Sequence, residues 1–335
     1  MLSSRTLTPS CPFNLLPSRF SMPFNGLALS RLFFEASLPL LRERIPDIMT
    51  RSAAGLVGEG SECLGLDDDI SRDHDWGPAF CLWVPDDLLR AELSRVEEAI
   101  ASLPASFQGF PTRMAKERRM GRTGPLPLKG FYRRFLGMDR APETWREWMA
   151  VPEYHLCSCT NGDVFMDEGG EFSAVREALL KYYPDDVRRK KIAARCMIMA
   201  QAGQYNLPRS LQRGNSMAAM LAAARFAEAA LSMAFLLNRR YMPFYKWAGR
   251  LAEILPILGQ QTASTVKILA RTPWDSQSLG AEASEAVENL CDLVAAELRR
   301  QALCDIQGNW LWQAGPLVQR GVKDPELRAR NVMED

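Results

Sequence analysis

Two carboxylates and a small-residue turn are the residues best suited to chemistry in this chain. Asp73 and Asp75 are two residues apart, and Gly60-Ser61 precedes them in the segment GEGSECLGLDDDISRDHDWGP. Side chains at positions i and i+2 of a strand point to the same face, so both acids would bind one divalent cation. A Gly-Ser turn offers backbone N–H groups and a hydroxyl to a phosphate. Together these features predict a site that handles nucleotides.

A calcium-binding loop is one alternative explanation for the acids. The EF-hand pattern requires Gly at its sixth position and Glu at its twelfth. Counted from Asp69, those positions hold His74 and Phe80, so the pattern fails. We expect His74 to be structural, because it lies between the two acids and would point to the opposite face.

An acidic surface loop is the second alternative. It accounts for residues 67–69, but it accounts less well for Asp73 and Asp75, which lie next to Trp76 and an apolar stretch. An acid near a core costs free energy unless it is paired or bound to a metal. We therefore predict that Asp73 and Asp75 are metal ligands.

Two other clusters allow a functional and a structural interpretation. His155, Cys157 and Cys159 would share one face of a strand, but zinc needs a fourth ligand and none has zinc-site spacing. We expect a buried strand there. Residues 238–247 combine basic and aromatic side chains, which suits phosphate binding and ring stacking but equally a helix–helix junction. The polar segment 201–213 would line a cleft or form a loop.

Lys246 is the most specific candidate in the 238–247 cluster. It stands between Tyr245 and Trp247, and burying a lysine without an anionic partner is costly. We expect Tyr245 or Lys246 to face the head domain across a cleft, close to the nucleotide or the acceptor. The alternative is a lysine whose stem packs while its amine reaches solvent.

The composition is that of an ordinary globular protein. The chain has 335 residues, of which 47% are hydrophobic and 24% charged, so two domains are expected. A net charge of +1 gives no overall attraction to nucleic acid or to an anionic membrane, and neither is an expected partner. The basic run at residues 188–191 is expected to be a solvated helix face.

Cysteine usage and hydropathy bear on location. The eight cysteines include no CxxC pair, which favours a reduced, cytoplasmic protein over a disulfide framework. The apolar segment 216–237 carries Arg225 and Glu228, so we expect a buried helix and not a membrane span. Residues 1–21 contain no acid and three prolines, and we expect a disordered extension, with Met22 as an alternative start.

Periodicity and turn signals predict a mixed first half and a helical second half. We expect helices over 26–49, 88–103 and 142–150 and almost continuously from 171. We expect strands over 53–58, 73–84 and 155–165, the last interrupted by an Asn161-Gly162 turn, and a long irregular segment over 104–130.

The Gly60-Ser61 turn followed by Asp73-x-Asp75 resembles the DNA polymerase β-type nucleotidyltransferase superfamily, in particular its aminoglycoside- and kanamycin-nucleotidyltransferase-like members. The longer string, with GQYN at 203–206 and YMPFYKW at 241–247, looks like a domain-of-unknown-function family with a nucleotidyltransferase-like head and a helical tail. The resemblance extends from Asn25 to about residue 320. It implies an α+β protein with a nucleotidyltransferase-like head over 22–170 and a helical-bundle domain over 171–335.

The resemblance also implies roles for individual residues. Gly60 and Ser61 would hold the triphosphate, Asp73 and Asp75 would hold magnesium, and Asp167 is the best positional match to a third carboxylate. Kanamycin-type enzymes use a helical Glu as base, and the comparable helix here carries Gln201 and Gln204.

The expected function is a magnesium-dependent transfer of a nucleoside monophosphate from a nucleoside triphosphate to a hydroxyl. The acceptor, a small molecule or a protein, is not specified by the sequence. The glutamines at 201 and 204 favour the alternative of a catalytically weak nucleotide-binding or regulatory protein, including a toxin–antitoxin module on the same fold.

Overall fold

The sheet and the helices described here come from a computed structural model that describes residues 25–73 and 76–335. The predicted extension at 1–21, His74 and Asp75 lie outside the described residues, as do the side chains of Arg72, Asp73 and Gln277. The chain divides into two compact units, each described by itself. The first comprises Met1–Pro142 and His155–Lys181, and the second comprises Glu143–Tyr154 and Tyr182–Asp335.

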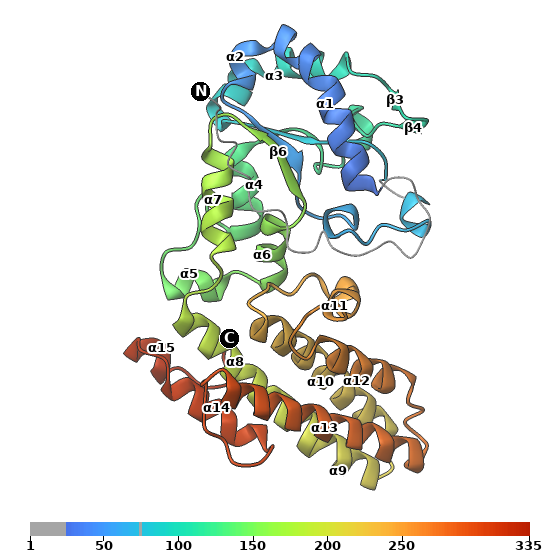
Figure 1. Cartoon of the computed structure of the whole chain (residues 1–335), viewed down its shortest axis with the longest axis vertical. Coiled ribbons are helices and arrows are strands. Elements are labelled where there is room, and N and C mark those ends of the chain that lie inside the picture. The colour runs from blue at the N-terminus through green and yellow to red at the C-terminus, as the bar shows by residue number, and fades with distance from the viewer. Residues whose placement is uncertain (1–24, 74–75) are drawn as a thin grey trace, which may run out of the picture. The chain divides into compact units, whose positions relative to one another are not determined.

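The first unit is a mixed α+β domain (Figure 1). Its elements, in chain order, are α1 (Gly26–Arg44), α2 (Pro46–Met49), β1 (Ala53–Leu56), η1 (Glu62–Leu64), η2 (Ile70–Asp73), β2 (Cys81–Val84), α3 (Asp86–Ala101), β3 (Ser106–Phe107), β4 (Phe110–Pro111), η3 (Lys116–Arg118), β5 (Gly124–Pro127), α4 (Leu128–Leu136), most of α6 (Glu153–Thr160), β6 (Asp163–Asp167) and α7 (Glu171–Leu180).

Four strands form one mixed sheet in the order β5-β2-β1-β6. The central strand β1 is antiparallel to both neighbours, while β2 and β5 are parallel. Leu56 at the end of β1 pairs with Asp163, and Ala53 at its start pairs with Asp167. This register decides which side chains share an end of the sheet.

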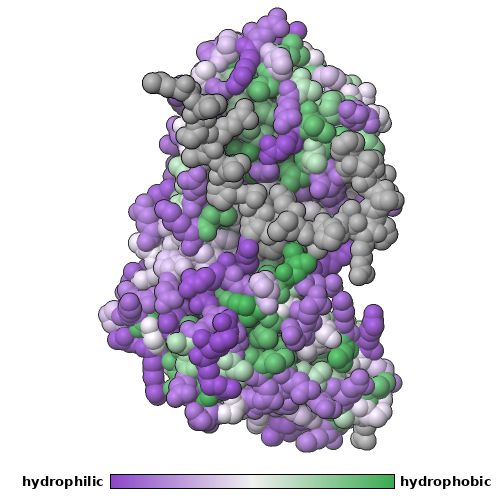
Figure 2. Space-filling view, in the orientation of Figure 1, coloured by the Kyte–Doolittle hydropathy of each residue, from purple (hydrophilic) through white to green (hydrophobic). Residues whose placement is uncertain are grey.

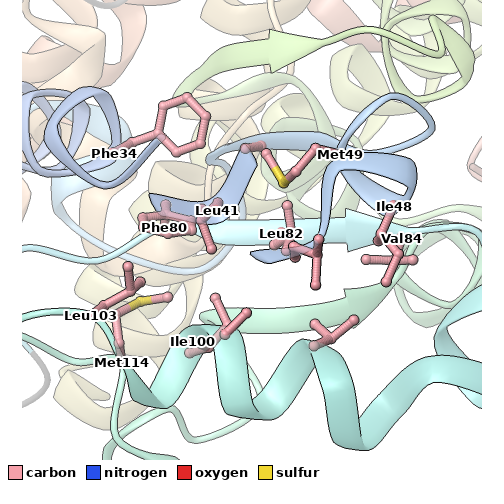
Figure 3. Close-up of a cluster of buried hydrophobic side chains, with 14 of the residues drawn as sticks. Phe34, Leu41, Ile48, Met49, Phe80, Leu82, Val84, Ile100, Leu103 and Met114 are labelled. Atoms are coloured by element: carbon pink, nitrogen blue, oxygen red, sulfur yellow. The ribbon is translucent and has the colours of Figure 1, made fainter. Parts of the chain in front are cut away.

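Apolar helices cover both faces of the sheet. Helices α1, α2 and α3 pack on one face, and side chains such as Phe34, Leu41 and Ile100 meet Leu82 of the sheet there (Figure 3). On the other face, Trp83 stacks on Phe172 of α7 with ring centroids 3.9 Å apart. Alternating side chains of β2 thus enter opposite cores, as the two-residue period of a strand requires.

Local sequence signals explain where several helices begin. Asn25 caps α1 by accepting a hydrogen bond from the backbone of Ala28 at 2.7 Å. Thr144 and Glu147 form a capping box at the start of α5 (Trp145–Ala150). The expected helices over 26–49, 88–103 and 142–150 are confirmed in these elements.

Two predicted strands are wrong in position or type. The strand expected over 73–84 begins only at Cys81, and Asp73 instead ends the 3-10 helix η2. His155, Cys157 and Cys159 lie on helix α6, and the strand starts at Asp163. Gly77 has a φ of +136°, so the chain turns sharply between η2 and β2. The irregular segment 104–130 contributes the edge strand β5.

The described residues of the second unit form helices joined by loops, without a strand. Besides α5, its elements are α8 (Asp185–Met199), the π-helix η4 (Ala200–Asn206), α9 (Leu207–Gln212), α10 (Ser216–Leu237), α11 (Tyr245–Ala252), α12 (Gly259–Arg271), α13 (Gln277–Arg300), α14 (Leu311–Arg320) and α15 (Pro325–Ala329). Helix α8 packs against both α10 and α14.

Helix α10 is long and apolar enough to cross a membrane by length and composition. Two-thirds of its most apolar stretch is buried inside the protein, as expected for a core helix, and the prediction of a buried helix over 216–237 is confirmed. Hydrophilic residues cover most of the coloured surface in Figure 2, and apolar residues form smaller patches.

The basic run at 188–191 is not the solvated face that we expected. Arg188, Lys190 and Lys191 are buried, at 2%, 0% and 4% exposure. Arg188 donates to the backbone oxygen of Leu236 at 3.0 Å, near the carboxyl end of α10. Cations are stabilised at that end of a helix, because its last carbonyl groups have no partner within the helix.

Candidate functional site

The loop at residues 58–61 leaves the central strand at the end where β6 begins. The Asn161 amide fixes its start, since Asn161 Oδ1 accepts from Gly58 N at 2.9 Å and Asn161 Nδ2 donates to Gly58 O at 2.7 Å. In the described part of the chain, the backbone N–H groups of Glu59, Gly60 and Ser61 have no acceptor. Three successive N–H groups of this kind can bind an anion.

Gly60 is required by a buried ion pair. Arg113 donates to the Glu62 carboxylate at 2.8 Å, and both side chains are buried. A Cβ atom at position 60 would lie 2.7 Å from Glu62 Oε2, which is too close for any other residue without a shift. The glycine in the predicted phosphate turn therefore also leaves room for the Glu62 carboxylate.

Ser61 is hydrogen-bonded to the segment that carries the first predicted metal ligand. Its hydroxyl lies 3.3 Å from the Ser71 hydroxyl, and Ser71 donates in turn to Asp68 Oδ1 at 3.1 Å. Ser71 belongs to η2, whose last residue is Asp73. Ser61 thus contacts the short helix that ends at Asp73, and the role of Asp73 stays a prediction.

The geometry expected for the metal pair is different. Asp73 ends a 3-10 helix, so the argument from two acids on one strand face does not apply, and Asp75 lies outside the described residues. Metal binding by these two acids stays a prediction from the sequence pattern. The described residues contain no group of three or more His, Cys, Asp or Glu that could hold a metal ion.

Asp67, beside this segment, has a structural role. Its Oδ2 atom accepts from the backbone of Gly26 at 2.7 Å and from Trp76 Nε1 at 3.0 Å. It therefore satisfies an N–H group at the start of α1, where a negative charge is favourable. The residues around the predicted metal ligands are in this way attached to the core.

A small pocket opens beside the 58–61 loop, and its lining is rich in charge. Residues from β1, the 58–61 loop, η1, β5, α4 and the segment before β5 line it, among them Glu59, Arg113, Arg122, Phe131 and Arg134. Three arginines and two glutamates, Glu59 and Glu62, contribute to the lining, which leaves one excess positive charge. Such a pocket suits an anionic ligand.

Glu59, which belongs to the 58–61 loop, forms ion pairs with two of these arginines. Its Oε2 atom accepts from Arg134 at 2.5 Å and lies 3.9 Å from Arg122 Nε. Arg134 also donates to Gly121 O at 3.0 Å. All three charged side chains are about half exposed, so they contact solvent as well as each other.

Buried cysteines do not supply a nucleophile here. Burial raises the pKa of the Cys81 thiol to about 12, so this thiol stays protonated at neutral pH. Cys81 Sγ lies 3.0 Å from Arg122 O, to which it donates. Burial likewise raises the pKa of Cys159 on α6.

Asp167 lies at the opposite end of β6 from the 58–61 loop. It pairs with Ala53 at the start of β1, and its carboxylate accepts from the backbones of Gly170 and Ser173 at 2.9 and 2.7 Å. Asp163, four residues earlier, lies at the end where the loop begins and is paired with Arg31.

Tyr245 and Lys246 lie on α11 in the second unit, and both are exposed. Lys246 Nζ lies 4.8 Å from the ring centroid of Trp247. The amine thus reaches solvent, as in the alternative, and a place for Tyr245 or Lys246 close to a nucleotide or acceptor stays a prediction.

The two glutamines that replace the helical Glu have different environments. Gln204 is buried in η4, where it donates to Glu288 at 2.8 Å and accepts from the backbone of Leu311 at 3.0 Å. Gln201, in the same π-helix, is exposed. Gln204 therefore joins segments of the helical unit.

Sequence reasoning missed the charged residues of the pocket. Glu59 stands inside the predicted phosphate turn, and Arg122 and Arg134 lie in or just after a stretch that we assigned to an irregular loop. The density of basic residues between 113 and 134 was the available signal. Its meaning depends on β5 and α4, which bring those residues to the 58–61 loop.

One family comparison gives a match. The family described as Domain of unknown function (DUF4037) matches residues 148–248. The expected similarity to a domain-of-unknown-function family is thus supported over this part of the chain, which includes α8, η4 and α10. Searches among curated proteins and among solved structures find no match.

Proposed function

We propose that this protein is a magnesium-dependent nucleotidyltransferase with a nucleotidyltransferase-like head in its first unit. The observation that carries the proposal is the 58–61 loop. Its three N–H groups have no acceptor among the described residues, and Ser61 contacts the helix that ends at Asp73. N–H groups that could bind a phosphate therefore lie beside η2, the helix that ends at the first predicted metal ligand.

In this proposal Gly60 and Ser61 hold the triphosphate of a nucleoside triphosphate. A hydroxyl of the acceptor attacks the α-phosphorus, the bond to the bridging oxygen breaks, and pyrophosphate leaves. Asp73 and Asp75 would hold magnesium, since carboxylate oxygens are the ligands that this ion prefers. Bound magnesium would neutralise charge that develops on the phosphate oxygens.

A pyrophosphate-release assay with magnesium, each nucleoside triphosphate and pools of hydroxyl acceptors tests this function. The Asp73→Asn and Asp75→Asn variants should lose release. Asp69→Asn changes an exposed acid of the same segment and should retain it. Equal release by all three variants would contradict the proposal. Mass spectrometry of co-expressed candidate proteins would detect a protein acceptor by its added nucleotide.

The alternative of a nucleotide-binding protein without turnover predicts a different result. Triphosphate binding would then depend on Asp73 and Asp75 in calorimetry, while no acceptor pool would support release. Gln204 favours this alternative, because it is engaged within the helical unit and an amide does not act as a general base.

A further inference from the structure

The 58–61 loop carries an anionic side chain at the place where the proposed function needs an anionic ligand. Glu59 is the first of three successive residues, 59–61, whose backbone N–H groups have no acceptor among the described residues. Its carboxylate contacts Arg134 and lies 3.9 Å from Arg122. A carboxylate and a phosphate oxygen make the same contacts with a guanidinium group.

We propose that Glu59 occupies the phosphate site as an internal competitor, and that Arg122 and Arg134 bind the terminal phosphates of a triphosphate once Glu59 is displaced. The inference rests on the proposed function for the identity of the ligand. It adds two phosphate-binding residues and a reason for ligand selectivity.

The contacts around the pocket allow this exchange. Glu59 is 45% exposed, so its side chain can move into solvent. Arg113, by contrast, is 4% exposed and bound to Glu62, so it remains in place as part of the wall. Arg134 keeps its bond to Gly121 O when Glu59 leaves, which holds its guanidinium group at the pocket.

Charge makes the competition selective. A carboxylate carries one negative charge, a terminal phosphate carries about −1.5 to −2 at neutral pH, and adjacent phosphates add more. A triphosphate therefore displaces Glu59 more readily than a single phosphate does. Glu59 would thus lower the affinity for inorganic phosphate relative to triphosphate.

Calorimetry with inorganic tripolyphosphate and with inorganic phosphate, in magnesium-free buffer, tests the inference without the predicted metal ligands. Glu59→Gln should bind tripolyphosphate about fivefold more tightly than wild type, because the competing charge is gone. The preference for tripolyphosphate over phosphate should fall in this variant. Arg134→Met should weaken tripolyphosphate binding about tenfold, the scale of a charge-assisted hydrogen bond.

Two matched controls separate site effects from general charge effects. Glu97 is held by Arg119 in the same unit and does not line the pocket, so Glu97→Gln should leave affinity unchanged. Arg133 neighbours Arg134 on α4, pairs with Asp86 and Asp139, and does not line the pocket either. Arg133→Met should therefore bind tripolyphosphate like wild type.

No tighter binding in Glu59→Gln than in Glu97→Gln, or no weaker binding in Arg134→Met than in Arg133→Met, would overturn the inference. If Arg134→Met unfolds in a thermal scan, Arg134→Lys replaces it, since lysine keeps the charge and loses the planar fork. The expected binding pattern without pyrophosphate release supports the inference and speaks against the transferase. Pyrophosphate release, together with tripolyphosphate binding that is the same in all variants, supports the transferase and speaks against the inference.

Discussion

The pocket region and the core of the helical unit both bury cations, but different groups hold them. Beside the pocket, Arg113 is bound to the Glu62 carboxylate. In α8, Arg188 is bound to the main-chain oxygen of Leu236 and the amide of Gln301, and Lys190 to the main-chain oxygen of Asn331. When a buried cation is removed, a carboxylate partner remains as an uncompensated buried charge. A neutral oxygen partner remains only as an unsatisfied hydrogen-bond acceptor.

The different partners of the buried cations indicate different roles for the two regions. Helix α8 uses cations to satisfy the ends of neighbouring segments, which is a structural task. The pocket has one more arginine than glutamates and lies beside a loop with N–H groups that have no acceptor among the described residues, and under these conditions an anion can bind. The comparison predicts unequal costs when single residues are removed.

The largest effect is expected for Arg113→Met. It leaves the Glu62 carboxylate buried and unpaired, which should lower the free energy of unfolding by about 3–5 kcal/mol. Urea unfolding measures the change. The double variant Arg113→Met/Glu62→Gln should recover a large part of the loss, because no buried charge remains. A double variant as unstable as the single one would show that packing, not charge, sets the cost.

A smaller effect is expected for Arg188→Met. It leaves Gln301 Oε1 without its donor and leaves Leu236 O with the 3.3 Å bond from Arg239 N, which should cost about 2–3 kcal/mol. The neighbouring variant Arg189→Met removes an ion pair with Asp185, one helical turn away, and should cost about 0.5 kcal/mol or less. A larger loss from Arg188→Met than from Arg113→Met in urea unfolding would break the comparison.

The same contrast explains what the sequence could predict. Helical periodicity and turn signals located α1, α3 and α5, because those signals act within one segment. The basic run at 188–191 was misplaced, because burial of Arg188 depends on the end of α10, which is far away in the sequence. The strand expected at 73–84 failed for a similar reason, since Trp76 and Phe80 are buried although the strand begins only at Cys81.

For the candidate site, the sequence indicated the Gly60-Ser61 turn and the acidic segment that follows it, but not the pocket. Gly60, Ser61 and Asp73 lie in one short segment, so local composition suffices to associate them. The arginines reach the loop through β5 and α4, and only the parallel pairing of β5 with β2 places that segment. Asp167 was chosen by distance along the chain, whereas the antiparallel register of β6 places Asp163 nearer the loop.

Asp167 allows a sharper test of this register. Asp167→Ala removes two hydrogen bonds to the backbone at the start of α7 and should lower the free energy of unfolding by about 1 kcal/mol. Pyrophosphate release should stay at the wild-type rate, because the carboxylate lies at the other end of the strand. Glu168→Gln, at the neighbouring exposed position, should change neither quantity. If a folded Asp167→Ala protein no longer released pyrophosphate, Asp167 would belong to the active site after all.

The last effect concerns Lys190 and is a dependence of stability on pH. Burial lowers the pKa of the Lys190 amine from 10.5 to about 8 in the folded protein, although Glu334 and Asp335 oppose the change. Between these two pH values the unfolded chain binds more protons than the folded protein. The free energy of unfolding therefore rises with pH in this window, by the contribution of this one group.

Urea unfolding of wild type and Lys190→Met at several pH values between 7 and 10.5 isolates that contribution, because other groups titrate equally in both proteins. The difference in unfolding free energy, wild type minus variant, should be constant below the folded pKa of about 8 and should increase above it. Lys181→Met, at an exposed position after α7, provides the baseline for removing a lysine. A difference that stays constant above pH 8 would mean that the Lys190 amine is as easily charged in the core as in water. The main-chain oxygen of Asn331 would then fully replace its hydration, and the contrast between the two groups of buried cations would disappear at this residue.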